Sequence, residues 1–171
     1  EHPSYGTADR LLPTLLDRLT DHAPQRGNDT VSERLITRKQ LRQIILRDLS
    51  WLLNATNAEA ELTLSDFPEV RASTLNYGLP AFSGKRISDV KLSDLEAAIK
   101  STIQQFEPRV MAQTLGVTAS LASDDEAAHN MVVFEIRGQI WAHPYPIEML
   151  LKSSIDLETG SVTLLDQMGD N

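Results

Sequence analysis

Apolar residues recur at helical spacing in the first two thirds of the chain. Leucines at this spacing in residues 8–21 predict a short helix, with Pro13 acceptable only in its first turn. Residues 37–54 predict a second, longer helix, and a third follows residue 92. The apolar stripes of these two helices are Leu41, Ile45, Leu49 and Leu52, and then Leu95, Ile99, Ile103 and Phe106. The sequence SDLE at 93–96 predicts a capping box, with Ser93 as N-cap and Glu96 at the third helical position.

After Pro108 the apolar period changes from helical to alternating, which is typical of strands. Alternation over residues 110–122 and 130–141 predicts two strands, and two shorter strands flank a turn at Thr159–Gly160. In the second strand Glu135, Arg137 and Gln139 oppose the apolar positions. The pattern therefore predicts an α+β fold, with the N-terminal helices packed on one face of a small C-terminal antiparallel sheet.

Two stretches lack an apolar period. Residues 22–36 contain Pro24, Gly27, Asn28 and Asp29, and this composition predicts a polar linker. We therefore expect residues 1–36 to form an arm of one helix and a linker, and residues 37–171 to form a single domain. Residues 55–92 are punctuated by proline and glycine and predict mainly loop, with a helical turn near residues 69–76.

The charge balance argues against polyanionic partners. Sixteen basic and 24 acidic residues give a formal net charge of -8, which disfavours nucleic acid and anionic lipid. No stretch reaches the ~20 apolar residues of a membrane span, so we expect no insertion into a membrane. The basic residues of the second helix lie largely outside its apolar stripe, and a solvated face is favoured over contact with an acidic partner. They are Arg38, Lys39, Arg42 and Arg47.

Candidate chemistry is sparse. The chain has no cysteine, and no phosphate-loop, dinucleotide-binding or zinc-protease motif occurs. Its histidines are scattered at His2, His22, His129 and His143. Glycoside hydrolysis requires two carboxyl groups, one of them protonated, and the best pair is Glu107 with Glu135. Arg109, however, favours the ionised form of Glu107, and the alternating pattern explains Glu135 as a solvent-facing strand residue. We therefore predict no catalytic residue, no metal site and no cofactor.

One motif joins the helical and the alternating regions. Glu107, Pro108 and Arg109 follow the third helix, and Pro108 both ends the helix and biases Glu107 towards an extended conformation. Residues two apart in an extended segment share a face, so Glu107 and Arg109 present their charges side by side. They can form an internal ion pair that fixes this corner, or contact complementary charges on another protein. The residues alone leave both alternatives open.

Several motifs occur in the order seen in the TssE family of type VI secretion baseplate components. They are LLPTLLDRLTD, LRDLSWLLN, DFPEVRASTLNYGLPAFSG, FEPRV, VFEIRGQIWAHP and SIDLETGSV. The resemblance runs from about residue 8 to 166, and its most specific parts are the FEPRV corner and the NYGLP turn. The TssE family is similar to wedge proteins of phage contractile tails, which carry an older lysozyme-like label.

The resemblance implies a structural role with no enzymatic activity. TssE-like proteins sit in the cytoplasmic baseplate, near the inner membrane, with the wedge proteins TssF, TssG and TssK. They adjoin the first layer of the TssB/TssC sheath, and a sheet edge with unpaired backbone groups can accept a strand from such a neighbour. In this context Glu107, Pro108 and Arg109 are expected to bind protein. The alternatives are a murein hydrolase, as the label suggests, or a regulatory anti-adaptor of the same fold.

Overall fold

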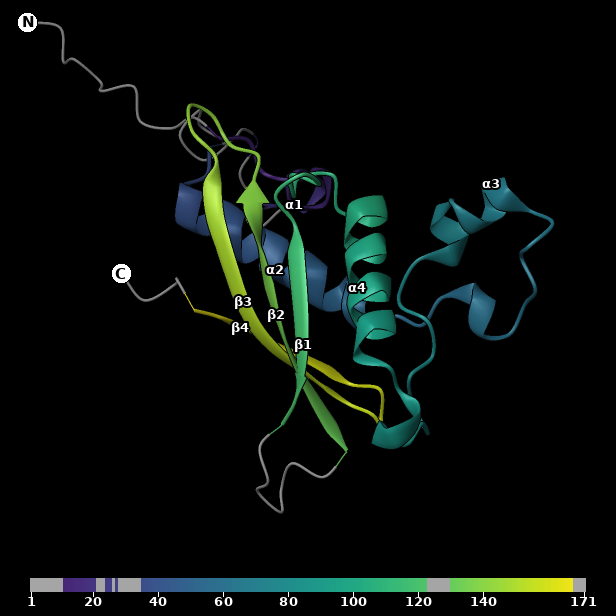
Figure 1. Ribbon diagram of the computed structural model, residues 1–171. Helices are drawn as coiled ribbons and strands as arrows, with labels where there is room; N and C mark the ends of the chain where they lie inside the picture. Colours follow the sequence, from purple (N-terminus) through teal and green to yellow (C-terminus); the bar gives the residue numbers. More distant parts are fainter. Residues whose placement is uncertain (1–10, 21–23, 26, 28–34, 123–129, 168–171) are drawn as a thin grey trace, which may run out of the picture.

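Helices come first and strands last, as the sequence predicts (Figure 1). The computed structural model describes residues 11–20, 24–25, 27, 35–122 and 130–167. The helices are α1 (Leu15–Leu19), α2 (Arg38–Asn54), α3 (Pro68–Arg71) and α4 (Leu92–Phe106), with 3-10 turns at Ala58–Ala60, Thr74–Asn76 and Ile87–Asp89. The strands are β1 (Gly116–Leu121), β2 (Met131–Ile140), β3 (Ile147–Asp156) and β4 (Val162–Asp166).

The sheet is an antiparallel meander in the order β1-β2-β3-β4. Alternate residues of β2 and β3 are buried, and they face α2 and α4. The predicted α+β fold is therefore confirmed, with the helices on one face of the sheet. The first strand begins later than expected, because residues 111–115 form a turn in which Thr114 N–H donates to the Met111 carbonyl at 2.9 Å.

Helix α2 spans most of the predicted segment, and its capping explains where it begins. The Thr37 side chain accepts a bond from Gln40 N–H, and the Gln40 side chain accepts one from Thr37 N–H. This reciprocal pair satisfies two backbone donors of the first turn. The predicted apolar stripe is buried, together with Leu53.

Helix α4 does not use the predicted capping box. Its N-cap is Lys91, which makes no side-chain capping bond, so Ser93 lies inside the helix. The Glu96 carboxylate instead accepts a bond from Ala119 N–H of β1 at 2.7 Å. The Glu96 carboxylate, which the local pattern assigned to the start of the helix, therefore binds a strand residue instead.

The N-terminal helix is shorter than expected. Thr14 is its N-cap, which places Pro13 before the helix, where its missing N–H costs no helical bond. Leu11 is nonetheless part of the hydrophobic core, and it pairs with Ile36 in an isolated antiparallel bridge. Most of the expected linker over 22–36 lies outside the described residues, so the division into an arm and a domain stays a prediction.

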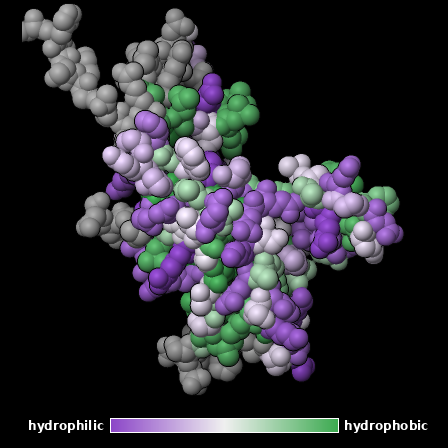
Figure 2. Space-filling model, turned by 45° about the horizontal axis from the view of Figure 1, so that its top comes forward, coloured by the Kyte–Doolittle hydropathy of each residue, from purple (hydrophilic) through white to green (hydrophobic). Residues whose placement is uncertain are grey.

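Residues 57–77 form a lobe that projects from the body of the molecule (Figures 1 and 2). Its ends are joined by two backbone bonds, from Leu79 N–H to the Ala55 carbonyl at 2.8 Å and from Asn57 N–H to the Leu79 carbonyl at 2.9 Å. Gly78 has a φ of 117°, and a Cβ atom there would lie 2.2 Å from the Ala55 oxygen. Glycine is therefore required where the lobe returns to the body.

Candidate functional site

The Glu107–Pro108–Arg109 corner lies at the end of α4, where its three side chains have different environments. Glu107 is the C-cap of α4, and only 3% of the residue is exposed. Pro108 is exposed, and the Arg109 side chain is 28% exposed. The structure therefore buries the acid of the motif and leaves the proline accessible to a partner.

Glu107 and Arg109 pair internally. The Arg109 backbone N–H and its Nε both donate to Glu107 Oε1, at 3.1 and 2.6 Å, and Nη2 donates to Oε2. A guanidinium group that contacts both carboxylate oxygens forms a charge-assisted pair with a fixed relative orientation. Of the two alternatives for these charges, the structure shows the internal pair.

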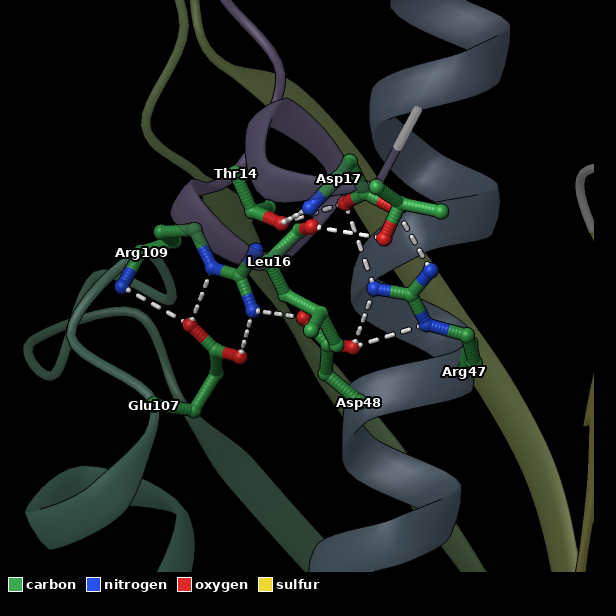
Figure 3. Close-up of polar contacts among 8 residues, drawn as sticks. Thr14, Leu16, Asp17, Arg47, Asp48, Glu107 and Arg109 are labelled. Carbon is green, nitrogen blue, oxygen red and sulfur yellow. Dashed lines mark hydrogen bonds and ion pairs between the residues drawn. The ribbon is translucent and has the colours of Figure 1, made fainter. Parts of the chain in front are cut away.

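The pair belongs to a longer chain of alternating charges (Figure 3). Arg109 Nη2 also donates to Asp48 Oδ2 of α2 at 2.7 Å. The other Asp48 oxygen accepts from Arg47 Nη2 at 2.8 Å and Nε at 2.9 Å. Arg47 in turn reaches Asp17 of α1, with Nη1 to Oδ1 at 2.7 Å and Nη2 to Oδ2 at 3.2 Å. We call this set of five residues the charge chain.

The charge chain connects α1, α2 and the corner after α4. Its three carboxylates and two guanidinium groups leave one net negative charge. Arg47, Asp48 and Arg109 each lie between two opposite charges, which compensates for their loss of hydration. The chain therefore fixes the position of the corner relative to two helices.

The pairing also shifts the pKa of three of these groups. The hydrogen bond from Arg47 lowers the pKa of Asp17, although burial acts in the opposite direction. The bond with Asp17 likewise raises the pKa of Arg47. Burial lowers the pKa of Arg109, but its bonds to Glu107 and Asp48 outweigh burial and the net change is upward. These shifts favour the ionised forms of Asp17, Arg47 and Arg109.

An aromatic residue extends the corner at the surface. The backbone N–H of Trp141 donates to the Arg109 carbonyl at 2.7 Å, while 67% of the residue is exposed. Exposed Pro108 and Trp141 thus belong to the same backbone-linked corner. Sequence reasoning did not single out Trp141 as part of the corner, because the bond that brings it there joins residues that are distant along the chain.

The basic residues of α2 are less solvated than expected, so that prediction was wrong for two of them. Arg47 is part of the charge chain, and Arg42 binds both carboxylate oxygens of Asp166 on β4, at 2.5 and 2.7 Å. Arg38 donates to the carbonyls of Tyr145 and Pro146, both at 3.0 Å. These arginines hold α2 against other parts of the same chain.

The two carboxylates considered for hydrolysis do not meet in one site. Glu135 lies on β2, on the face of the sheet away from the helices, where it pairs with Arg137. Glu107 lies instead at the end of α4, where it pairs with Arg109. Within the described parts of the chain, no group of three His, Cys, Asp or Glu residues is placed to hold a metal ion.

The family model for baseplate wedge protein gp25 matches residues 39–145, more than half of the chain. The chain belongs to the gp25 baseplate wedge family. TssE is in the same family, so the resemblance found in the sequence is confirmed at this level. The matched range includes α2, the lobe, α4, the corner and β2. No curated protein and no solved structure matches the chain significantly.

Membership of the gp25 family makes the chain a structural component of a baseplate. The charge chain fits this role, because it gives a defined shape to a surface corner. Among the described helices of this gp25-family chain, none is long and apolar enough to cross a membrane.

Proposed function

We propose that this chain is a structural component of a type VI secretion baseplate and joins the wedge complex to the first layer of the contractile sheath. The supporting observation is the rigid corner at Glu107–Arg109 in a gp25-family chain. A corner whose charges are already satisfied keeps its shape without a partner, which lowers the entropic cost of assembly. Pro108 and Trp141 present its contact surface.

The wedge partners are TssF, TssG and TssK, and the sheath partners are TssB and TssC. The assembly lies in the cytoplasm at the inner-membrane-associated baseplate. Wedge proteins contact the corner formed by Glu107, Pro108 and Arg109, and the sheath side uses the antiparallel sheet. The geometry supports this proposed division of surfaces, because the corner and the sheet edges are different parts of the fold.

Hydrolase activity is not favoured by the site. Hydrolysis requires a carboxyl group that can donate a proton to the leaving group. Glu107 accepts bonds from three N–H groups of Arg109, so both of its carboxylate oxygens are already engaged within the corner. No observation favours the anti-adaptor alternative.

Co-purification with co-expressed TssF, TssG and TssK tests the proposal. The wild-type chain should recover the wedge proteins, and a Pro108→Ser/Trp141→Ala variant should recover at least fivefold less. Both altered side chains are exposed, so circular dichroism should show a folded variant.

Phe67→Ala is the matched control, because Phe67 is an aromatic residue of the lobe that is 59% exposed. This variant should recover the wedge proteins at the wild-type level. A wild-type chain that recovers none of the three proteins would refute the baseplate role. Equal recovery by the double variant would refute the corner as the wedge contact.

A further inference from the structure

A cavity separates the lobe from helix α4. The lobe lies beside α4 (Figure 1), and the cavity between them has a volume of about 540 Å³. One wall consists of residues that recur at helical spacing and so share a face of α4: Ala98, Ser101, Thr102, Gln105 and Phe106. The other wall is the lobe, whose Arg71 carbonyl accepts a bond from the Gln105 side chain at 3.3 Å. We call this space the lobe cavity.

Asn57 lines the lobe cavity with a side-chain oxygen that is not hydrogen-bonded. Only 8% of Asn57 is exposed, and within the described parts of the chain its Oδ1 atom has no partner. The residue is the N-cap of the turn at Ala58–Ala60, yet its side chain makes no capping bond. The Glu59 N–H donates instead to Asn76 Oδ1 at 3.2 Å. Because a buried polar group without a bond destabilises a fold, Asn57 carries an amide that the fold itself does not use.

Asn76, the second buried amide of the lobe cavity, is bonded at both ends of its side chain. Its Oδ1 accepts from Glu59 N–H, and its Nδ2 donates to the Arg71 carbonyl at 3.1 Å and to Glu59 Oε2 at 3.2 Å. The Glu59 carboxylate also pairs with Arg71, whose Nε lies 2.8 Å from Oε1. These bonds fix the wall around Asn57. A ligand that pairs with Asn57 therefore meets a preformed site, which lowers the entropic cost of binding.

The lining of the lobe cavity indicates an uncharged ligand. Among the described residues that line it, the charged ones are Glu59 and Arg71, and they pair with each other. The lobe carries four acidic residues and one basic residue, and the whole chain has a net charge of -8, so a phosphate or carboxylate ligand is disfavoured. The remaining lining combines amides and hydroxyls with apolar Ala72, Ala98 and Phe106, as in many ligand sites. The peptide unit is a neutral group that both donates and accepts, whatever the sequence that carries it.

We propose that the lobe cavity binds an extended segment of a partner protein through its main chain, and that Asn57 pairs with one peptide unit of this segment. Asn57 Oδ1 accepts from a peptide N–H, and Nδ2 donates to a peptide carbonyl. The exposed side chains of Ser101 and Gln105 on the opposite wall contact the next unit. The cavity is lined by neither the charge chain nor the sheet, so this contact goes beyond the proposed wedge and sheath contacts.

Nuclear magnetic resonance of the isotopically labelled chain tests this contact. The probe is a capped, uncharged hexapeptide in which alanine alternates with serine. On titration, the side-chain amide signals of Asn57 and the backbone signal of Ser101 should shift and saturate with one common dissociation constant. The side-chain signals of Gln43, which is exposed on α2, should not move.

Two comparisons separate main-chain recognition from other binding. The same peptide with methylated main-chain nitrogens keeps its side chains but has no N–H donors, so it should bind the wild-type chain about fivefold more weakly. Asn57→Leu is similar in volume to the wild type but has no amide, and it should lose about the same factor towards the unmodified peptide. Gln43→Ala is the matched control and should bind with wild-type affinity.

The stability of the free chain gives a second, independent readout. In Asn57→Leu the urea midpoint should equal or exceed that of the wild type, because the Asn57 oxygen makes no bond in the fold. Asn76→Leu removes the bonds of a similarly buried amide, so its midpoint should fall clearly below that of the wild type. A residue that folding does not require but binding does is a ligand contact.

The proposal is overturned if the hexapeptide causes no saturable shift at Asn57, or if the methylated peptide or Asn57→Leu shows undiminished affinity. A midpoint that falls in Asn57→Leu as far as in Asn76→Leu would also overturn it, because Asn57 would then be bonded within the fold. Tighter binding of adenosine monophosphate than of the peptide would refute a peptide ligand. These measurements use the purified chain alone, so recovery of the wedge proteins tests the baseplate role separately.

Discussion

Glu107 shows how a single buried acid can be tolerated at the end of a helix. Its position near the negative end of the α4 dipole is unfavourable for an anion. Arg109 compensates by donating three N–H groups to Glu107, and its guanidinium group also donates to Asp48. Such a pair contributes little net stability, but it makes each partner dependent on the other. The motif therefore specifies the geometry of the corner.

Replacing Arg109 with alanine should be strongly destabilising. Arg109→Ala leaves Glu107 as a buried charge without its partner, and we expect a loss of ~3–5 kcal/mol in the free energy of unfolding. Urea denaturation followed by circular dichroism measures this change. The double variant Glu107→Gln/Arg109→Met should lose clearly less, because no buried charge remains. A loss below ~0.5 kcal/mol in Arg109→Ala would mean that the pair is not buried in solution.

Secondary structure elements were predictable where local patterns decide them. The apolar stripe and Thr37 of α2 locate that helix, and Pro108 locates the end of α4. The SDLE pattern misled because Glu96 has a better partner in Ala119, 23 residues away. Asp166, which pairs with Arg42, and Asp17, which pairs with Arg47, lie 124 and 30 residues from these arginines. Periodicity shows which face a residue occupies but not which distant residue meets it there.

The ion pair that joins helix α1 to α2 should weaken as the pH falls. The folded state lowers the pKa of Asp17, so the pair with Arg47 contributes fully above about pH 4, the ordinary value of the carboxyl group. The contribution disappears as the pH falls through the lowered pKa. Because the pair is partly exposed, we expect an effect of about 1 kcal/mol or less.

The comparison with Asp17→Asn isolates this effect. The wild type should exceed Asp17→Asn in unfolding free energy at pH 6, and the difference should shrink between about pH 4 and pH 2. Urea titrations at each pH provide the values. A difference that stays constant with pH would show that Asp17 does not titrate in contact with Arg47.

In the whole molecule, the two long helices contact the sheet in two ways: they pack on it in the hydrophobic core, and their side chains bond to its edge strands. The core is the buried apolar set that joins α2 and α4 to the sheet. At the edges, Asn54, Arg42 and Glu96 fasten the helices to the outer strands. The sequence predicted the layers, because these follow from apolar faces. It did not predict the edge contacts, which depend on strand register.

Replacing Asn54 should loosen β4 from α2. Asn54→Ala leaves the outward N–H and C=O groups of Val162 without their side-chain partner, which should cost about 1 kcal/mol in stability. Hydrogen exchange should also show faster exchange of the Val162 amide. Gln43→Ala is the control, because Gln43 is an exposed residue of the same helix and should change stability by less than ~0.5 kcal/mol. Unchanged exchange at Val162 would contradict the bridge.

The closed ends of the lobe over 57–77 make it a natural insertion point for a reporter. The backbone bond between Leu79 and Ala55 already holds the two ends of the lobe together. A longer lobe would therefore add little loop-closure entropy. A small fluorescent domain or an epitope tag could be placed near the exposed Leu62, within the lobe that projects from the body of the molecule (Figure 1). Assembly of the tagged subunit could then be followed by light microscopy.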